Sequence, residues 1–179
     1  NERDEDIIDK LVEYVPNSNK HERTRITNFS NGKEVTTKIF NNHRKEFRDS
    51  LILHGFPTSD KTLSACPPIG EYSKYDFWSG VIDGDGSIGF ITGGIPFVSL
   101  VTKSESLKEA YVLFLREELG IEKKINRNKR DNVFNITVKL ESAVKLANLL
   151  YFNDSMGSIQ PLYLDRKFNS AKQVILWKR

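Results

Sequence analysis

From residue 72 onward, stretches with helical spacing of apolar residues alternate with pairs of strand-like stretches, and this order constrains the fold more than any other feature. The expected elements are a helix, two strands, a helix, two strands and a helix, over residues 72–82, 87–92, 96–102, 104–119, 121–127, 133–140 and 141–151. A last helix is expected within residues 162–177. This αββαββα order predicts an α+β unit whose antiparallel sheet has one face free of helices.

The residues before this unit predict a shorter version of the same pattern. They contain a helix, two strands joined by Asn31-Gly32, and a second helix followed by a linker, over residues 4–15, 23–29, 34–40, 43–54 and 57–68. This α-β-β-α order matches the second half of the later unit. We therefore expect residues 1–70 to form a partial repeat or a small DNA-binding module, and residues 71–179 to form the main domain.

Composition narrows the class of protein only modestly. The chain has 179 residues, a net charge of +3 and a single cysteine, Cys66, so an internal disulfide is excluded and a metal would need oxygen ligands. The sequence offers no long apolar run and no signal peptide, which predicts a protein that stays inside the cell and is not secreted.

The segment Trp78-Ser79-Gly80-Val81-Ile82-Asp83-Gly84-Asp85-Gly86-Ser87 carries the most specific motif of the chain. It resembles the motif of the LAGLIDADG family in its small residue, its glycine, its apolar pair and its D-x-D-G ending, although Trp78 stands where leucine is usual. The resemblance covers roughly residues 72–172. It implies a saddle-shaped sheet, a homing endonuclease that cuts double-stranded DNA at a long site, and a role in intron or intein mobility.

Asp85 is the expected catalytic and metal-binding acid. A carboxylate at the C-terminal end of a helix faces unpaired carbonyl groups, and a bound cation relieves the repulsion. The carboxylate of Asp85 and the carbonyl of Gly84 are hard oxygen ligands suited to Mg²⁺ or another divalent cation. A plain structural turn is the alternative for these residues. A calcium loop is excluded because Ile88 stands where such a loop needs glycine.

Two lysines are candidates for the same chemistry through the resemblance. Lys167 occupies the start of the last helix, where the family carries a basic residue that assists the attacking water, and Lys103 ends the second strand, where a water-positioning residue is usual. The resemblance also implies that motif helices pack in pairs, with Gly80 allowing close backbone contact. The second acid would then come from a homodimer or from a complementary chain or segment.

Double-stranded DNA is the expected partner, and the helix-free sheet face is its expected binding surface. Polar and basic side chains of strands and of the basic turn are the candidates for base and phosphate contacts: Arg23, Arg25, Lys38, Ser87, Thr102, Lys124, Arg127, Lys129, Arg130, Asn135, Thr137 and Lys139. The competing hypothesis is a regulator or RNA splicing factor of the same fold that binds nucleic acid without cleaving it.

Overall fold

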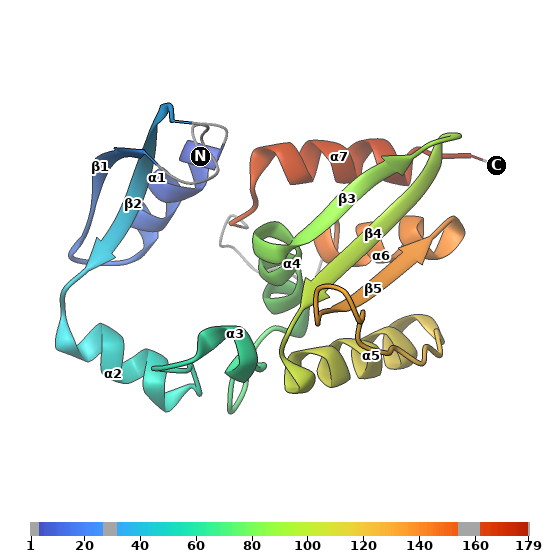
Figure 1. Cartoon of the computed structure of the whole chain (residues 1–179), viewed down its shortest axis with the longest axis horizontal. Coiled ribbons are helices and arrows are strands. Elements are labelled where there is room, and N and C mark those ends of the chain that lie inside the picture. The colour runs from blue at the N-terminus through green and yellow to red at the C-terminus, as the bar shows by residue number, and fades with distance from the viewer. Residues whose placement is uncertain (1–3, 27–31, 154–161, 179) are drawn as a thin grey trace.

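The computed structural model of the chain describes residues 4–26, 32–153 and 162–178. Figure 1 shows a larger part that contains a sheet and most of the helices, and a smaller N-terminal part that reaches it through a curved connection. Within the described residues, no helix is long and apolar enough to cross a membrane.

The larger part confirms the expected α+β class. Its elements are α4 (Lys74–Asp85), β3 (Gly86–Ile91), β4 (Ile95–Thr102), α5 (Glu105–Leu119), β5 (Phe134–Lys139), α6 (Glu141–Tyr151) and α7 (Asp165–Ile175). The strands form an antiparallel sheet in the order β3-β4-β5, with Ser87 opposite Ser99 and Ser99 opposite Thr137.

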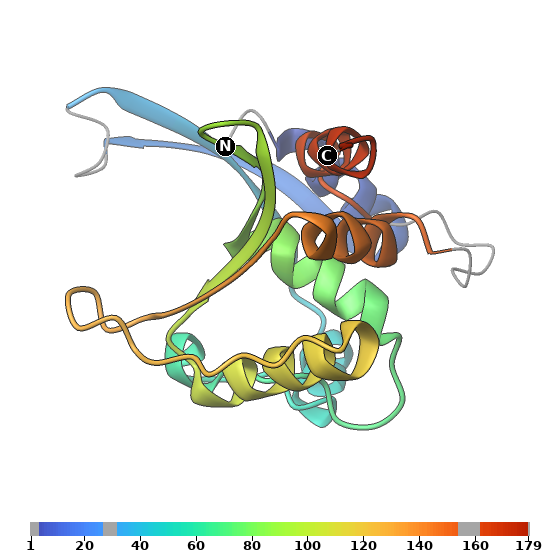
Figure 2. The same cartoon turned by 90° about the vertical axis from the view of Figure 1, so that its right-hand side faces the viewer.

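One face of this curved sheet is covered by helices and the other is not (Figure 2). The covered face carries the buried side chains of alternate strand residues, among them Ile88, Val98 and Ile136, which pack with α4 and α6 into one core. Since strand side chains alternate between faces, the residues between them point to the helix-free side. The open sheet face expected from the sequence is therefore present.

The predicted strand over residues 121–127 is absent, so the sheet has three strands among the described residues. Ile121 and Ile125 instead pack against the core beside α5, and Arg127 lies 4.3 Å from the centre of the Phe134 ring. The two isoleucines are four residues apart. This spacing puts both side chains on one side of a strand, but it also lets an irregular segment beside α5 bury both of them. The second strand of the expected hairpin forms as β5, and its turn forms as well, where the Asn128 N–H donates to the Val133 carbonyl over 2.7 Å.

The start of α4 and both ends of α5 follow local sequence signals. Ser73 and Ser104 cap α4 and α5 by accepting backbone N–H bonds, and Gly120 ends α5 at a φ of +65°. The prediction ended the first helix at residue 82 because glycines are weak helix formers. In the structure α4 continues to Asp85, three residues further, because tertiary contacts hold its last turn.

The N-terminal part has the expected order of a helix, a hairpin and a helix. Its elements are α1 (Glu5–Tyr14), β1 (Ser18–Ile26), β2 (Glu34–Asn42), α2 (Lys45–Leu53) and the one-turn helix α3 (Lys61–Ser64), which lies inside the predicted linker. The first strand begins five residues before its predicted start, because pairing with β2 extends it into a polar stretch. Residues 27–29 of the predicted first strand, residues 30–31 of the predicted turn and residues 154–161 of the predicted loop lie outside the described residues.

The hydroxyl of Tyr111 gives a test of the core. Tyr111 is fully buried, and its oxygen has no hydrogen-bond partner among the residues that the structure describes. A buried polar group without a partner costs about 1–3 kcal/mol. We expect Tyr111→Phe to raise the free energy of unfolding by about 1 kcal/mol, measured by urea denaturation.

Tyr163→Phe is the matched control for this substitution. The Tyr163 hydroxyl donates to the Leu150 carbonyl over 3.2 Å, so its removal should lower stability by about 1 kcal/mol. A Tyr111→Phe protein less stable than the wild type would contradict the assignment.

Candidate active site at the end of helix α4

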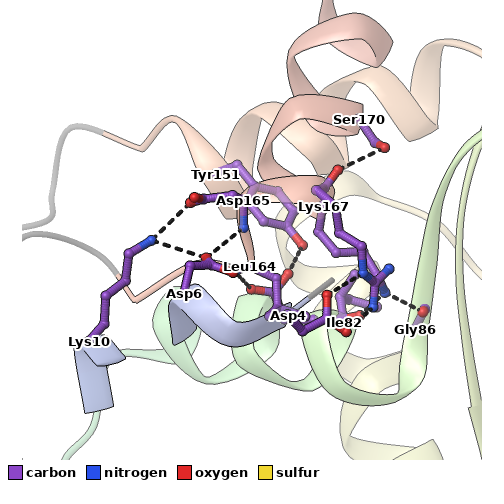
Figure 3. Close-up of polar contacts among 12 residues, drawn as sticks. Asp4, Asp6, Lys10, Ile82, Gly86, Tyr151, Leu164, Asp165, Lys167 and Ser170 are labelled. Carbon is purple, nitrogen blue, oxygen red and sulfur yellow. Dashed lines mark hydrogen bonds and ion pairs between the residues drawn. The ribbon is translucent and has the colours of Figure 1, made fainter. Parts of the chain in front are cut away.

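Asp83, the first acid of the D-x-D-G segment, is buried and fixes the last turn of α4. Its Oδ1 accepts a hydrogen bond from the Tyr151 hydroxyl over 2.6 Å, and its Oδ2 accepts one from the Leu164 backbone N–H over 2.7 Å. Figure 3 shows these bonds joining the helix to α6 and to the start of α7. Burial raises the pKa of Asp83 above its usual value of 3.8, against the lowering effect of both hydrogen bonds.

Lys167, from α7, caps the same helix end. Its side chain is buried, and its Nζ donates to the carbonyl oxygen of Ile82 over 2.8 Å and to that of Gly86 over 2.5 Å (Figure 3). These bonds occupy carbonyls that a helix end leaves without N–H partners, and the positive charge faces the negative end of the helix dipole. Burial lowers the pKa of Lys167. The ammonium predicted to assist catalysis is thus bonded inside the protein.

Gly86 explains the last position of the motif. A Cβ atom built on Gly86 would lie 2.8 Å from the Cα and the carbonyl oxygen of Ile82. Backbone atoms cannot move aside as a flexible side chain can, so glycine is the residue that lets β3 start directly after α4.

Asp85, the second acid, has surroundings opposite to those of Asp83. Its side chain is exposed and lines a cavity of about 370 Å³ together with Thr102, Lys103 and Lys61. The structure therefore brings two residues predicted to be catalytic, Asp85 and Lys103, to one cavity. Thr102 is also there, but its Oγ1 accepts the Ser104 backbone N–H over 3.1 Å and so serves the start of α5.

The donor atoms at this position fit a cation that is shared with a phosphate. Within the described residues, no group of three or more His, Cys, Asp or Glu side chains could hold a metal by itself. Asp85 offers one carboxylate, and Gly84 lies in the last helical turn, where carbonyls lack intrahelical partners. Mg²⁺ commonly takes one or two carboxylates and completes its shell with water and substrate phosphate. The carboxylate of Asp85 and the carbonyl of Gly84 are enough protein ligands for a Mg²⁺ ion bound in this way.

The helix-free face of the main sheet displays four of the predicted DNA-contact residues. Ser87, Asn135, Thr137 and Lys139 alternate with buried residues along β3 and β5. The Thr137 hydroxyl donates to the Asn135 side-chain oxygen over 2.9 Å, as expected for two side chains on one face. The face is therefore polar where the sequence predicted it.

The basic turn is only partly available for such contacts. Arg127 donates to the Lys103 and Asn132 carbonyls and lies 3.5 Å from Glu105, so its guanidinium is bound within the protein. Arg130 pairs with Asp131 next to it, at 2.9 Å. Lys124 lies along α5 beside a different cavity, whereas Lys129 is exposed in the turn.

The first hairpin divides its predicted contacts between two faces. Arg23 and Arg25 are exposed on β1, but Lys38 on β2 bonds to Glu5 of α1 over 2.5 Å. In the register of this hairpin, Lys38 is opposite Glu22, the residue that precedes Arg23. Because neighbouring residues of a strand point to opposite faces, Lys38 faces α1 while both arginines face away from it.

Ion pairs that the sequence did not predict connect α1 with the start of α7. Arg166 donates to both carboxylate oxygens of Asp4, and Lys10 pairs with Asp165 over 2.9 Å and with Asp6 over 3.4 Å (Figure 3). The only signal in the sequence was the acidic content of the first helix, and acidic residues are equally common on helix faces that contact only solvent. These pairs place the N-terminal part beside Asp83 and the foot of α4.

Residues of α2 and α3 face one side of α4 across a cavity. Gly80 and Gly84 are exposed and four residues apart, and a Cβ atom on either would find nothing within 4 Å. A largely apolar cavity of about 420 Å³ lies along this side, between Phe77 and Val81 of the helix and the segment that contains Phe56. Gly80 is thus placed on an open helix surface, as an interface residue requires.

Comparison with known families agrees with this geometry. Residues 74–156 match the family model described as LAGLIDADG-like domain, and no curated protein matches the chain. The matched segment begins with α4 and extends just beyond α6. Residues 74–156 are therefore similar to a LAGLIDADG-like domain, and this match supports the family resemblance for this part of the chain.

The buried acid yields a prediction about stability. Asp83→Ala leaves the Tyr151 hydroxyl and the Leu164 N–H without their acceptor and should cost about 3 kcal/mol. Asp83→Asn should cost less, because its side-chain oxygen can accept from Leu164 while its NH₂ group donates to the Tyr151 oxygen. Asp76→Asn, an exposed acid at the other end of α4, is the control.

The raised pKa of Asp83 also predicts how the difference in stability between Asp83→Asn and the wild type changes with pH. Because the folded pKa of Asp83 is raised, its contribution to stability is fully present below the unfolded pKa and is lost as pH rises through the folded value. Urea denaturation from pH 3 to about pH 7 should show that the stability of Asp83→Asn relative to the wild type improves with rising pH. A constant or falling difference would contradict the raised pKa.

Proposed function

We propose that the chain is a site-specific endonuclease that hydrolyses phosphodiester bonds of double-stranded DNA with Mg²⁺ or another divalent cation. The observation that carries this proposal is the exposed carboxylate of Asp85, which lies at the end of a LAGLIDADG motif helix and beside Lys103. The buried side chains of Asp83 and Lys167 stabilise that helix end from inside the protein. Asp85 is the exposed acid of the D-x-D-G segment, so it is the one that can face a substrate.

Each group near Asp85 has a part in the proposed reaction. The divalent cation, when bound at Asp85 and the Gly84 carbonyl, supplies charge stabilisation and a more acidic water. The Lys103 ammonium offsets negative charge that develops on the phosphate. Ser87, Asn135, Thr137 and Lys139 of the open face, together with Arg23 and Arg25 of the first hairpin, are the proposed DNA contacts.

A regulator or splicing factor that binds nucleic acid without cutting it is the second candidate. The small number of acids at the site favours it, since Asp85 is the one exposed carboxylate at the C-terminal end of α4 and the described residues hold no group of three or more acids or other ligands that could bind a metal. Both candidates predict an affinity for duplex DNA that falls with salt. Only the endonuclease hypothesis predicts new DNA ends that appear when a divalent metal ion is present.

Asp85→Asn tests the proposed function. The substitution keeps the size of the side chain but removes the anionic ligand, so DNA cleavage should fall by roughly 100-fold or more while DNA affinity is retained or slightly increased. Cleavage is measured on a randomised plasmid library with Mg²⁺, by sequencing the ends, and affinity is measured by gel shift in EDTA.

Asp76→Asn again serves as the control, because it removes the same charge from the exposed other end of the same helix. It should cleave like the wild type. If Asp85→Asn also cleaves like the wild type, the proposed role of Asp85 is wrong, and if the wild type binds duplexes but produces no ends, the binding protein is the better assignment.

We further infer that a second copy of this chain supplies a second Asp85 by packing its α4 against the side of the first that carries the exposed Gly80 and Gly84. Two glycines four residues apart let helix backbones approach closely, and the apolar residues beside them favour burial. Cleavage of both strands needs an acid for each strand. A complementary polypeptide with its own motif helix is the other possible source.

Gly80→Ala tests this packing through two effects of opposite sign. Within one chain the new methyl group meets no atom, and alanine favours a helix over glycine, so the monomer should gain about 0.5–1 kcal/mol of stability. Against a packed helix the methyl group should weaken self-association by about tenfold or more. Sedimentation equilibrium measures association, and thermal unfolding of dilute protein measures stability.

Asn148→Ala is the matched control, since Asn148 is exposed on α6, in the layer of helices behind the sheet. It should also stabilise its helix but leave association unchanged. A wild-type chain that stays monomeric and cleaves DNA only after a second polypeptide is added would assign the second acid to that polypeptide.

A further inference from the structure

Lys61 belongs to a segment predicted as a linker, yet it lies at the candidate active site. The cavity of about 370 Å³ beside the sheet and the cavity of about 420 Å³ beside α4 have Asp85 and Lys61 in common. Ala65 and Leu107 are the other residues that line both cavities. Lys61 therefore lines the same two cavities as the acid.

The one-turn helix that carries Lys61 is attached to the main domain. The Ser104 hydroxyl, which caps α5, donates to the Ala65 carbonyl over 2.5 Å, and the Ala65 N–H donates to the Lys61 carbonyl over 3.1 Å. Ser104 is completely buried, so this connection belongs to the interior rather than to a solvated loop. The position of Lys61 thus depends on the same residue that starts α5.

The charge of Lys61 is not used within the described residues. Its ammonium lies 5.1 Å from the centre of the Phe56 ring, and no carboxylate there forms an ion pair with it, whereas Lys10, Lys38 and Lys108 all have one. A cation held over an aromatic ring keeps its N–H groups available for another ligand. With Lys103 it gives the surroundings of Asp85 two positive charges against one negative charge, a balance suited to a phosphate.

We propose that Lys61 is a catalytic residue that binds a non-bridging oxygen of the scissile phosphate. This role rests on the proposed endonuclease and deepens it, because it makes the segment around α3 part of the active site. The ammonium stabilises the negative charge that grows on the phosphate as water attacks and the leaving oxygen departs. Lys61 thus complements Lys103, since the two lysines line one cavity from different elements, α3 and the end of β4.

Lys61→Met and Lys61→Arg test the role on the intact chain. The substrate is the duplex that the wild type cleaves out of a randomised plasmid library, and the measurements are the single-turnover cleavage rate with Mg²⁺ and the Kd in EDTA. Lys61→Met should lower the rate roughly 10- to 100-fold and change the Kd much less, because the contact strengthens as charge develops. Lys61→Arg keeps the charge and should recover most of the rate.

Lys145→Met is the matched control. Lys145 is exposed on α6, behind the sheet, and its loss should leave the rate unchanged. Thermal unfolding shows that the variants fold. If the wild type cleaves and Lys61→Met cleaves equally, or loses affinity by the same factor as rate, the catalytic role of Lys61 is overturned while the endonuclease stands. If the wild type cleaves no duplex, both proposals fail.

Discussion

The end of α4 concentrates negative charge, and the remaining structure is arranged around that point. A helix terminus exposes unpaired carbonyls and the negative end of the dipole, and here two aspartates are added within its last three residues. The buried ammonium of Lys167 offsets this charge by donating hydrogen bonds to two backbone carbonyls. The Tyr151 hydroxyl of α6 and the Leu164 N–H at the start of α7 donate to Asp83. With these groups bonded internally, Asp85 is the acid of this helix end that is left open to solvent, and a substrate-bound cation can balance its charge.

The sequence predicted the fold where the local pattern and the tertiary environment agree. Apolar alternation in β5 and the Ser104 and Gly120 ends of α5 specify their elements without long-range help. The prediction was wrong at residues 121–127, where contact with α5 rather than strand pairing accommodates the apolar positions. It was also wrong about the end of α4, because stabilisation by Lys167 comes from a residue more than eighty positions later.

The residue types of the candidate site could be predicted from the sequence, but which of them are buried and which face the cavity could not. The motif indicated Asp85, and the strand order brought Lys103 to it. Nothing in the spacing distinguishes a buried lysine from an exposed one, so Lys167 could be expected near the helix end but not bonded to it from inside. Lys61 had no signal at all, because a linker takes its position from contacts such as the Ser104–Ala65 bond, which join residues far apart in the sequence.

Two separate connections bring the N-terminal part to the same helix end. The ion pairs of Asp4 and Lys10 with Arg166 and Asp165 join α1 to the start of α7, directly beside the backbone that bonds to Asp83. The α3 segment reaches the same helix end at the cavity that Asp85 lines. The placement of the first hairpin relative to the main sheet is therefore fixed at the point where the proposed chemistry occurs. A duplex lying across both strand surfaces would be held on either side of its scissile phosphate, so binding and cleavage would depend on one set of contacts.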